Sequence, residues 1–113
     1  MRLPGAEHSI CDATKVQDYL LSREHPVGRA KAQFFESLGF TRAEWPALQS
    51  ALLRVGRDGE AELGAASVFG QKYVVRGTIQ GPSGDTAAIV TVWIMLTGET
   101  TPRLITAHPG SLR

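Results

Sequence analysis

The hydrophobic periodicity of this 113-residue chain changes near Gly59, and this change constrains the fold more than any other feature. Before this point apolar residues recur at the three- and four-residue spacing of amphipathic helices, whereas after it they alternate with a period of two, as in strands. Short turns join the strand-like segments, which favours an antiparallel meander. The sequence therefore predicts an α+β fold with two or three N-terminal helices packed on one face of a three- to four-stranded antiparallel sheet.

The length of the chain is typical of one domain, and we expect residues 1–113 to form it. Within this domain we expect an irregular N-terminal arm over residues 1–12, a helical part over residues 13–56 and the antiparallel sheet over residues 59–109. No repeat or low-complexity linker divides the sequence.

The helical part contains the start and stop signals of three helices. The first is expected from about Ala13 to Ser22, and a third ends at Gly56. Between them lies the stretch 25–40, in which Pro26 suits the first turn of a helix and Gly39 a left-handed C-cap. One face of this central helix carries four apolar residues, namely Val27, Phe34, Phe35 and Leu38.

The second half of the chain contains a weak strand over residues 61–69 and three stronger strands. These run from Gln71 to Gln80, from Thr86 to Leu96 and from Arg103 to His108. The segment from Thr86 to Leu96 is apolar on both faces, so we expect it in the middle of the sheet. In the last strand the alternation places Leu104, Thr106 and His108 on one face and Arg103 on the other.

Composition limits the classes of function. The formal net charge is +1, from 12 basic and 11 acidic residues, so a polyanion would have to bind at a local patch. The single cysteine, Cys11, excludes an internal disulfide. There is no signal-like N-terminus and no apolar run long enough to span a bilayer, so we expect a cytoplasmic protein without a membrane segment. His8 and Cys11 form only half of a metal-binding pattern, and we expect neither a metal site nor a cofactor.

Lys31 lies in the middle of the apolar face of the central helix. One interpretation is that its methylene stem packs on the core while the ammonium reaches water beyond the helix end. The other is that this end of the helix borders a cleft, into which Lys31 points with His25 and Arg29. A cationic cluster of this kind would suit a phosphate or a developing anion.

The strands carry a second set of candidate residues. Trp93 and Thr91 share a face of the central strand, where they would either contact a base and a phosphate or pack in the core. Thr106 and His108 lie near the end of the last strand. A second histidine opposite His25 would complete an acid–base pair for RNA transesterification, and the alternative is a histidine without a role at the end of the chain.

Four segments of the chain resemble a family of small bacterial proteins known as a domain of unknown function. They are HPVGRAKAQFFESLGF, GQKYVV followed by GPSG, TVWI and PRLITAHP, and the resemblance runs from about Lys15 to Pro109. Similar domains stand alone or at the C-terminal tips of contact-dependent-inhibition and other polymorphic toxins. The order of elements also resembles the ribonuclease fold of barnase, EndoU, the tRNA-cleaving colicins and RelE. The resemblance falls on His25, Pro26, Gly28, Arg29, Lys31, Ala32, Phe35, Gly39, Tyr73, Trp93, Arg103 and Thr106.

This resemblance implies a toxin-type, metal-independent endoribonuclease that cleaves RNA such as tRNA and is neutralised by an immunity or antitoxin protein. The catalytic residues would be His25, Lys31, Arg29, Thr106 and His108, and the substrate would contact Thr91, Trp93 and Tyr73. His25 would act as the general base or acid, and Lys31 and Arg29 would hold the phosphate. The alternative is a non-catalytic module, an immunity or accessory protein of a toxin system, that binds another protein.

Overall fold

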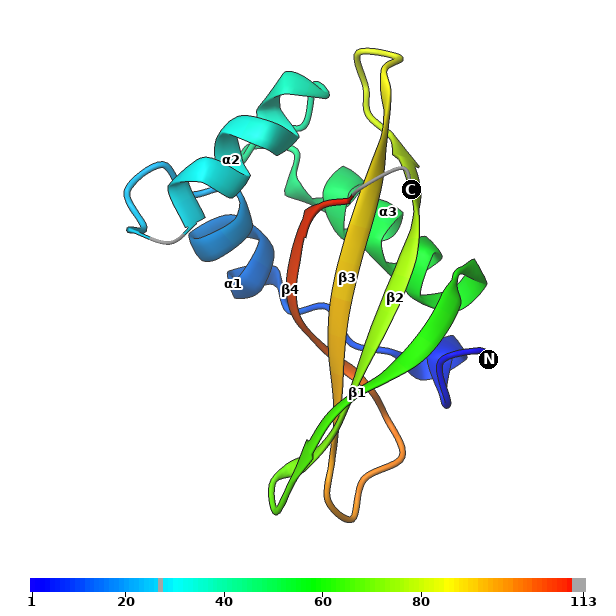
Figure 1. Cartoon of the computed structure of the whole chain (residues 1–113). Coiled ribbons are helices and arrows are strands. Elements are labelled where there is room, and N and C mark those ends of the chain that lie inside the picture. The colour runs from blue at the N-terminus through cyan, green and yellow to red at the C-terminus, as the bar shows by residue number, and fades with distance from the viewer. Residues whose placement is uncertain (27, 111–113) are drawn as a thin grey trace.

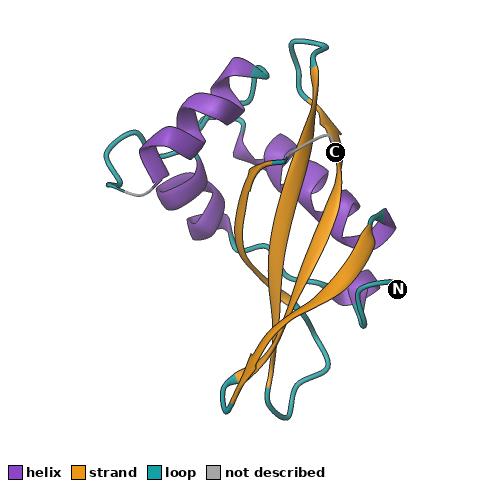
Figure 2. Cartoon of the chain, viewed as in Figure 1, coloured by secondary structure: helices purple, strands orange, loops and turns teal. Residues whose placement is uncertain are grey.

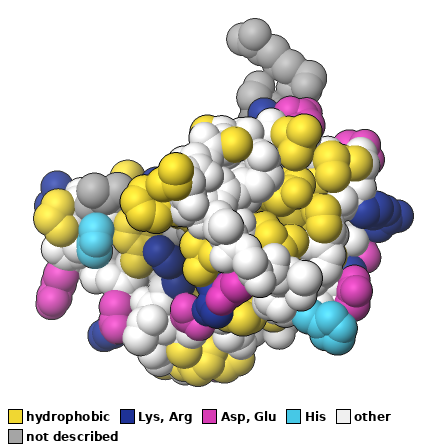
Figure 3. Space-filling model, turned by 90° about the horizontal axis from the view of Figure 1, so that it is seen from below, with side chains coloured by type: hydrophobic (Ala, Val, Ile, Leu, Met, Phe, Trp, Pro, Cys, Tyr) yellow, Lys and Arg dark blue, Asp and Glu magenta, His cyan; other side chains and the backbone are white. Residues whose placement is uncertain are grey.

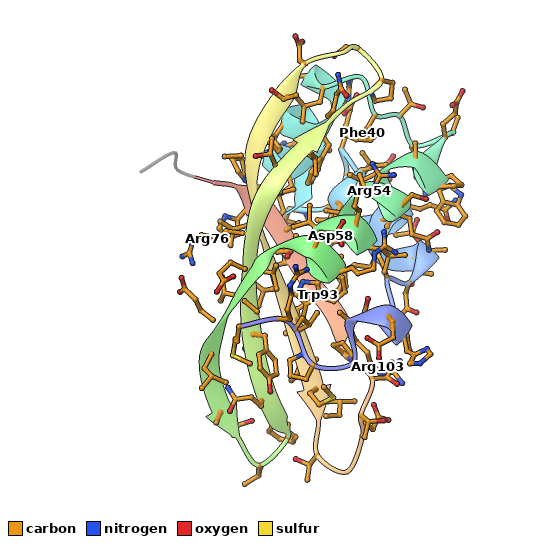
Figure 4. The ribbon with its side chains drawn as sticks, turned by 90° about the vertical axis from the view of Figure 1, so that its right-hand side faces the viewer. Phe40, Arg54, Asp58, Arg76, Trp93 and Arg103 are labelled. Atoms are coloured by element: carbon orange, nitrogen blue, oxygen red, sulfur yellow. The ribbon has the colours of Figure 1, made fainter. Side chains whose placement is uncertain are left out.

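The structure is a computed structural model, and it describes residues 1–26 and 28–110. Its strands form one antiparallel sheet in the order β1-β2-β3-β4, and each strand pairs with the next one along the chain (Figure 1, Figure 2). The helices precede the sheet in sequence and lie together on one side of it, as the view along the sheet shows (Figure 4). The predicted α+β fold with an antiparallel meander is therefore confirmed.

The helical part of the chain consists of three short segments and two longer helices. They are η1 (Ala6–His8), α1 (Ala13–Lys15), the π-helical η2 (Val16–Leu20), α2 (Gly28–Ser37) and α3 (Trp45–Asp58). Within the described residues, no helix has both the length and the apolar character needed to cross a membrane.

The first predicted helix changes its hydrogen-bonding pattern half-way. Its second half, η2, is a π turn in which the Leu21 N–H donates to the Val16 carbonyl oxygen at 2.9 Å, five residues back. Such wide turns are rare and often occur at functional sites. The turn still buries Val16 and Leu20 against the rest of the protein, as the apolar pattern predicts, while its remaining residues reach the surface.

The central predicted helix is shorter than expected because α2 begins at Gly28, and Pro26 belongs to the turn before it. Gly39 has a φ of 95°, so the predicted left-handed C-cap is confirmed. Phe35 is fully buried, in agreement with the predicted apolar face. Val27, which was expected on the same face, lies outside the described residues.

The predicted end of the third helix at Gly56 is wrong, because α3 continues to Asp58. Gly56 lies against the ring of Trp93, and a Cβ atom at this position would be 2.5 Å from Cζ2 of that ring. The glycine is therefore a packing residue that lets the helix approach the sheet closely, and not a cap.

The strands are β1 (Glu60–Ser67), β2 (Gly70–Gln80), β3 (Thr86–Leu96) and β4 (Arg103–Pro109). As predicted from its two apolar faces, β3 is paired on both sides, with β2 and with β4. The ladder between β1 and β2 is irregular near the tip of their hairpin, which is consistent with the weak strand pattern of this segment.

The prediction that Leu104, Thr106 and His108 share one face of the last strand is wrong, because β4 contains a bulge. The register shifts after the pair formed by Leu104 and Trp93, and Ile105 is an extra residue. Leu104 therefore lies on the helix-covered face, whereas Thr106 and His108 lie on the opposite face. A strict period of two cannot detect this change, because an extra residue reverses the direction of every side chain beyond it.

The N-terminal arm is an integral part of the domain. Leu3, Ala6 and Cys11 are buried in the same core as the helices, and Ile10 forms a parallel bridge with Arg103 at the outer edge of β4. The arm passes behind the sheet in Figure 1 and leaves the opposite sheet face uncovered.

Candidate functional site

Four side chains from three parts of the chain meet around Tyr19, and we call these five residues the tyrosine cluster. The Tyr19 hydroxyl lies 3.2 Å from Oγ1 of Thr106. The His25 ring packs edge-on against the tyrosine ring, with 4.9 Å between centroids and 80° between planes. Nζ of Lys31 lies 5.8 Å from the centroid of the same ring, and Nζ of Lys15 lies 5.1 Å from it. The fold thus brings three predicted site residues to one point.

The local sequence explains how these side chains come together. The π turn of η2 carries Tyr19 toward β4, where Thr106 lies beyond the bulge. At Gly28 the start of α2 approaches the Tyr19 carbonyl oxygen so closely that a Cβ atom there would overlap this oxygen. Only glycine permits this approach, and it places His25 and Lys31 beside the tyrosine ring.

The hydrogen bonds of His25 define one tautomer of its neutral ring. The Gly28 N–H donates to Nδ1 of His25 at 3.1 Å, so Nδ1 is an acceptor and the ring proton lies on Nε2. The main chain of His25 is also held, because its N–H donates to the Ser22 hydroxyl and its carbonyl accepts from the Arg29 N–H. This residue is therefore oriented by its surroundings rather than being a loose connector.

Lys31 is half-buried, and its ammonium reaches toward the tyrosine ring. The contact is a cation–π interaction, and Lys15 makes a second one with the same ring. In the part of the chain that the structure describes, neither ammonium forms an ion pair. Two cations with no acidic partner create a positive spot on a protein of net charge +1.

Arg29 does not join the cluster. It precedes Lys31 by two residues on α2, which is a rotation of about 200° around the helix axis, and its side chain is exposed. The predicted pairing of Arg29 with Lys31 on one phosphate therefore does not fit the helix geometry.

His108 lies two residues beyond Thr106 on the same face of β4 and is half-buried. Its Nδ1 is 3.1 Å from the Pro109 carbonyl oxygen, which can only accept a hydrogen bond. The neutral ring therefore carries its proton on Nδ1 and leaves the lone pair of Nε2 available. This is the tautomer opposite to that of His25.

The prediction that Thr91 and Trp93 contact a substrate is corrected by the structure. Both side chains are fully buried. Figure 4 shows Trp93 beside α3, where its ring lies against Gly56. Nε1 of Trp93 donates to Oγ1 of Thr91 at 2.8 Å, and this hydroxyl donates to the Val75 carbonyl oxygen at 2.8 Å. Tyr73 faces Trp93 across the strands and packs half-buried on the core. These residues support the fold, and the polar side-chain atoms of Thr91 and Trp93 are satisfied within it.

The cluster contains two residues that were not predicted, Tyr19 and Lys15. Tyr19 lies within the first predicted helix, where a tyrosine that packs on the core needs a partner for its hydroxyl. The four-residue spacing of Lys15 and Tyr19 is the sequence signal that could have suggested their contact.

A charged cavity of about 490 Å³ lies on another side of η2. Its charges are paired internally, because Arg23 binds Glu36 at 2.6 Å and Arg42 binds Asp18 at 2.7 Å. Hydrogen bonding from the Arg23 guanidinium lowers the pKa of Glu36 below its usual range. This cavity therefore offers less unpaired positive charge to an anion than the tyrosine cluster does.

Within residues 1–26 and 28–110, we find no group of three or more histidine, cysteine or acidic side chains that could hold a metal ion. Cys11 is buried, and burial raises the pKa of its thiol to about 12, so the thiol stays protonated at neutral pH. His8 is exposed at the end of η1. Figure 3 shows basic and acidic side chains interleaved over one further face of the molecule, rather than a continuous basic surface.

Residues 2–111 match the profile of the family described as Domain of unknown function (DUF6883). The chain belongs to this family. Its fold is similar to that of a chain in a solved structure, the contact-dependent growth inhibition toxin–immunity protein complex from Klebsiella pneumoniae 342. The TM-score is 0.72 with 19% sequence identity, over 95% of this chain and 97% of that chain. A search of curated proteins found no match.

Proposed function

We propose that this DUF6883 domain is a toxin-system module that cleaves RNA without a metal ion, at the tyrosine cluster. The observation that carries the proposal is the meeting of His25, the hydroxyl of Thr106 and two lysine ammonium groups at Tyr19, where neither ammonium forms an ion pair with a residue that the structure describes. The likeness in fold to a chain of a toxin–immunity complex supports the toxin setting. Its site of action would be the cytoplasm, where RNA is available.

The chemistry would be attack of the RNA 2′-hydroxyl on the adjacent phosphorus, giving a 2′,3′-cyclic phosphate and a free 5′-hydroxyl. The ammonium of Lys31 lies against the phosphate, offsets the charge that develops on its oxygens and protonates the leaving 5′-oxygen. Nε2–H of His25 donates a hydrogen bond to a phosphoryl oxygen, as its tautomer requires. The hydroxyls of Tyr19 and Thr106 orient the same phosphate.

His108 is the group we assign as general base. Its Nε2 holds a free lone pair because Nδ1 faces the Pro109 carbonyl. It lies two residues from Thr106 on one strand face, which separates their Cα atoms by about 7 Å. A ribose placed beside the phosphate would thus have its 2′-hydroxyl within the range of this side chain. The two histidines have different tautomers, and each suits a different step of the reaction.

The experiment is incubation of the purified protein with total tRNA and ribosomal RNA in EDTA. We expect discrete fragments that end in a 2′,3′-cyclic phosphate. Lys31→Ala and His108→Ala should each slow cleavage by about 100-fold or more, the usual contribution of a positioned acid or base. Lys72→Ala is the matched control, because it removes an exposed lysine from β2, and it should cleave at the wild-type rate. Intact RNA with folded wild-type protein would refute the proposal.

Tyr19→Phe tests the centre of the cluster more finely. It keeps the ring on which the two lysines and His25 pack and removes only the hydroxyl that contacts Thr106. We expect a smaller loss than for Lys31→Ala, because the hydroxyl positions the phosphate and transfers no proton. A loss as large as that of Lys31→Ala would assign Tyr19 a direct part in proton transfer.

A specific surface favours a second candidate, a non-catalytic module that binds another protein. Val68 and Phe69 are 84% and 74% exposed at the tip of the β1–β2 hairpin, which extends beyond the helices (Figure 1), and Leu63 on β1 is 65% exposed. Exposed large apolar side chains grouped at one tip are typical of protein-binding sites. Intact RNA in the assay above would favour this second candidate.

A further inference from the structure

The edge of β2 is only partly covered by β1. The ladder between these strands ends at the pair Glu60 and Arg76, because the chain before Glu60 turns at Gly59 into α3. β2 itself continues to Gln80 and stays paired with β3 along its full length. Residues 77–80 therefore form an open sheet edge, which we call the upper β2 edge.

The direction of the backbone groups along this edge follows from the strand pairing and one hydrogen bond of β3. The Ala88 carbonyl oxygen accepts a hydrogen bond from the Gly110 N–H, so Ala88 directs its backbone groups away from β2. Thr78 is paired opposite Ala88, and its N–H and C=O must therefore point away from β3, toward the uncovered side. Because backbone groups alternate in direction along a strand, the N–H and C=O of Gln80 also point to that side. The backbone groups of Gly77 and Ile79 point to β3 and form hydrogen bonds with it.

A groove of about 340 Å³ runs along the upper β2 edge, between it and α3. The helix lines the groove with Ala51, Arg54, Val55 and Asp58, and Figure 4 shows Arg54 and Asp58 on the side of α3 beside β2. Arg76 points to the opposite face of the sheet in the same view. The groove thus combines an apolar wall, the cationic side chain of Arg54, the acidic side chain of Asp58, which pairs with Arg57, and two sets of backbone donors and acceptors.

Proteins usually protect an open sheet edge with lysine, proline, a bulge or a covering segment. Residues 77–80 read Gly-Thr-Ile-Gln and carry neither a charge nor a proline, and β2 keeps a regular register with β3 there. In the described part of the chain, no side chain forms a hydrogen bond with the backbone of Thr78. An unprotected edge beside a groove indicates a place where another strand binds.

We propose that the upper β2 edge binds an extended segment of a partner protein, which adds a fifth strand in line with β1. The backbone of the segment pairs with Thr78 and Gln80. One of its side chains points into the groove, and a small apolar residue fits there against Ala51 and Val55. An acidic residue two positions along the segment faces the same side and reaches Arg54, which forms no ion pair among the described residues.

This site is separate from the tyrosine cluster. The upper β2 edge lies beside α3, whereas the cluster lies where η2 and α2 meet β4, the strand at the far edge of the sheet (Figure 1). The strand-binding proposal therefore does not depend on cleavage of RNA, and either proposal can fail while the other holds.

The geometry is tested first in the free protein, by amide hydrogen exchange measured with NMR. We expect the amides of Thr78 and Gln80 to exchange rapidly and those of Gly77 and Ile79, which bond to β3, to be protected at least 100-fold more. Equal protection of all four amides would show that the edge is already paired and would overturn the proposal. Protection of Thr78 and Gln80 that rises with protein concentration would identify a second copy of the chain as the occupant, and would also overturn it.

Binding is then tested with a capped probe peptide, acetyl-Thr-Val-Thr-Glu-Thr-amide, whose valine and glutamate share one face of a strand. We expect it to shift the Thr78 and Gln80 amide signals and to slow their exchange. Thr78→Pro removes the edge N–H and should weaken binding at least tenfold, since proline is tolerated on an edge that faces away from its paired strand. Thr78→Val keeps the N–H and is the matched control, with binding expected within about twofold of wild type.

Arg54→Glu provides a test that does not depend on the folding of the proline variant. The substitution should weaken binding of the probe peptide at least fivefold, because the charge on α3 is reversed. It should strengthen binding of a second peptide in which lysine replaces the glutamate. Absence of amide shifts at millimolar peptide, or equal binding by the Thr78→Pro and Thr78→Val variants, would overturn the proposal.

Discussion

The buried hydrogen bonds of Thr91 provide the sharpest test of the core. Its hydroxyl accepts from Nε1 of Trp93 and donates to the Val75 carbonyl, both at 2.8 Å, and both side chains are fully buried. Thr91→Val keeps the shape of the side chain and its β-branching, and it removes both hydrogen bonds at once. The substitution leaves the indole N–H of Trp93 buried without an acceptor.

The expected cost follows from these contacts. A buried donor left without a partner costs about 1–3 kcal/mol, and the lost bond to the Val75 carbonyl adds about 1 kcal/mol. We therefore expect Thr91→Val to lower the free energy of unfolding by about 2–4 kcal/mol. For a domain of this size each kcal/mol corresponds to about 4 °C, so the Tm should fall by about 8–16 °C.

The assay is urea and thermal unfolding followed by far-UV circular dichroism, because a signal from Trp93 would itself change with the substitution. Thr91→Ser keeps the hydroxyl and removes one buried methyl group, so it should lower the free energy of unfolding by only about 1 kcal/mol. In a Trp93→Phe background the cost of Thr91→Val should fall to about 1 kcal/mol, since the orphaned donor is gone. A Thr91→Val protein within about 0.5 kcal/mol of wild type would refute the reasoning.

Two further predictions concern the core. Gly56→Ala should destabilise the protein by about 1–3 kcal/mol in urea unfolding, although alanine usually favours a helix, because its Cβ would lie 2.5 Å from the buried Trp93 ring; a gain in stability would contradict the packing. Burial raises the pKa of Cys11 to about 12, above its unfolded value, so the thiol contributes stability that is present below about pH 8.5 and lost as the pH rises toward 12. The gap in unfolding free energy between wild type and Cys11→Ala should thus shrink by about 1–2 kcal/mol between pH 8 and pH 10, and an unchanged gap would disprove this linkage.

Local patterns of the sequence predict much of the architecture. The change of period near Gly59 determined the α+β class, and short turns determined the antiparallel order of strands. The left-handed conformation of Gly39 followed from its place after an apolar helix face. These features depend on residues within a few positions of one another, so a single segment contains enough information to predict them.

The candidate site was predictable only in part. The position of Lys31 in an apolar face drew attention to this residue, and the structure places it with His25 on the Tyr19 ring. The sequence could not show that Tyr19 joins them to Thr106, because the two hydroxyls are 87 positions apart in the chain. Their contact depends on the docking of η2 against β4, which no local pattern reports.

What the sequence by itself determined is the type and order of the elements and the apolar face of most of them. Only the tertiary structure decided which sheet face the helices cover, and it placed Thr91 and Trp93 in the core. It also decided the side on which Thr106 lies, because the bulge at Ile105 arises from pairing with β3. The physical reason is that periodicity fixes the relative direction of side chains within one element, whereas burial and register depend on the elements that pack against it.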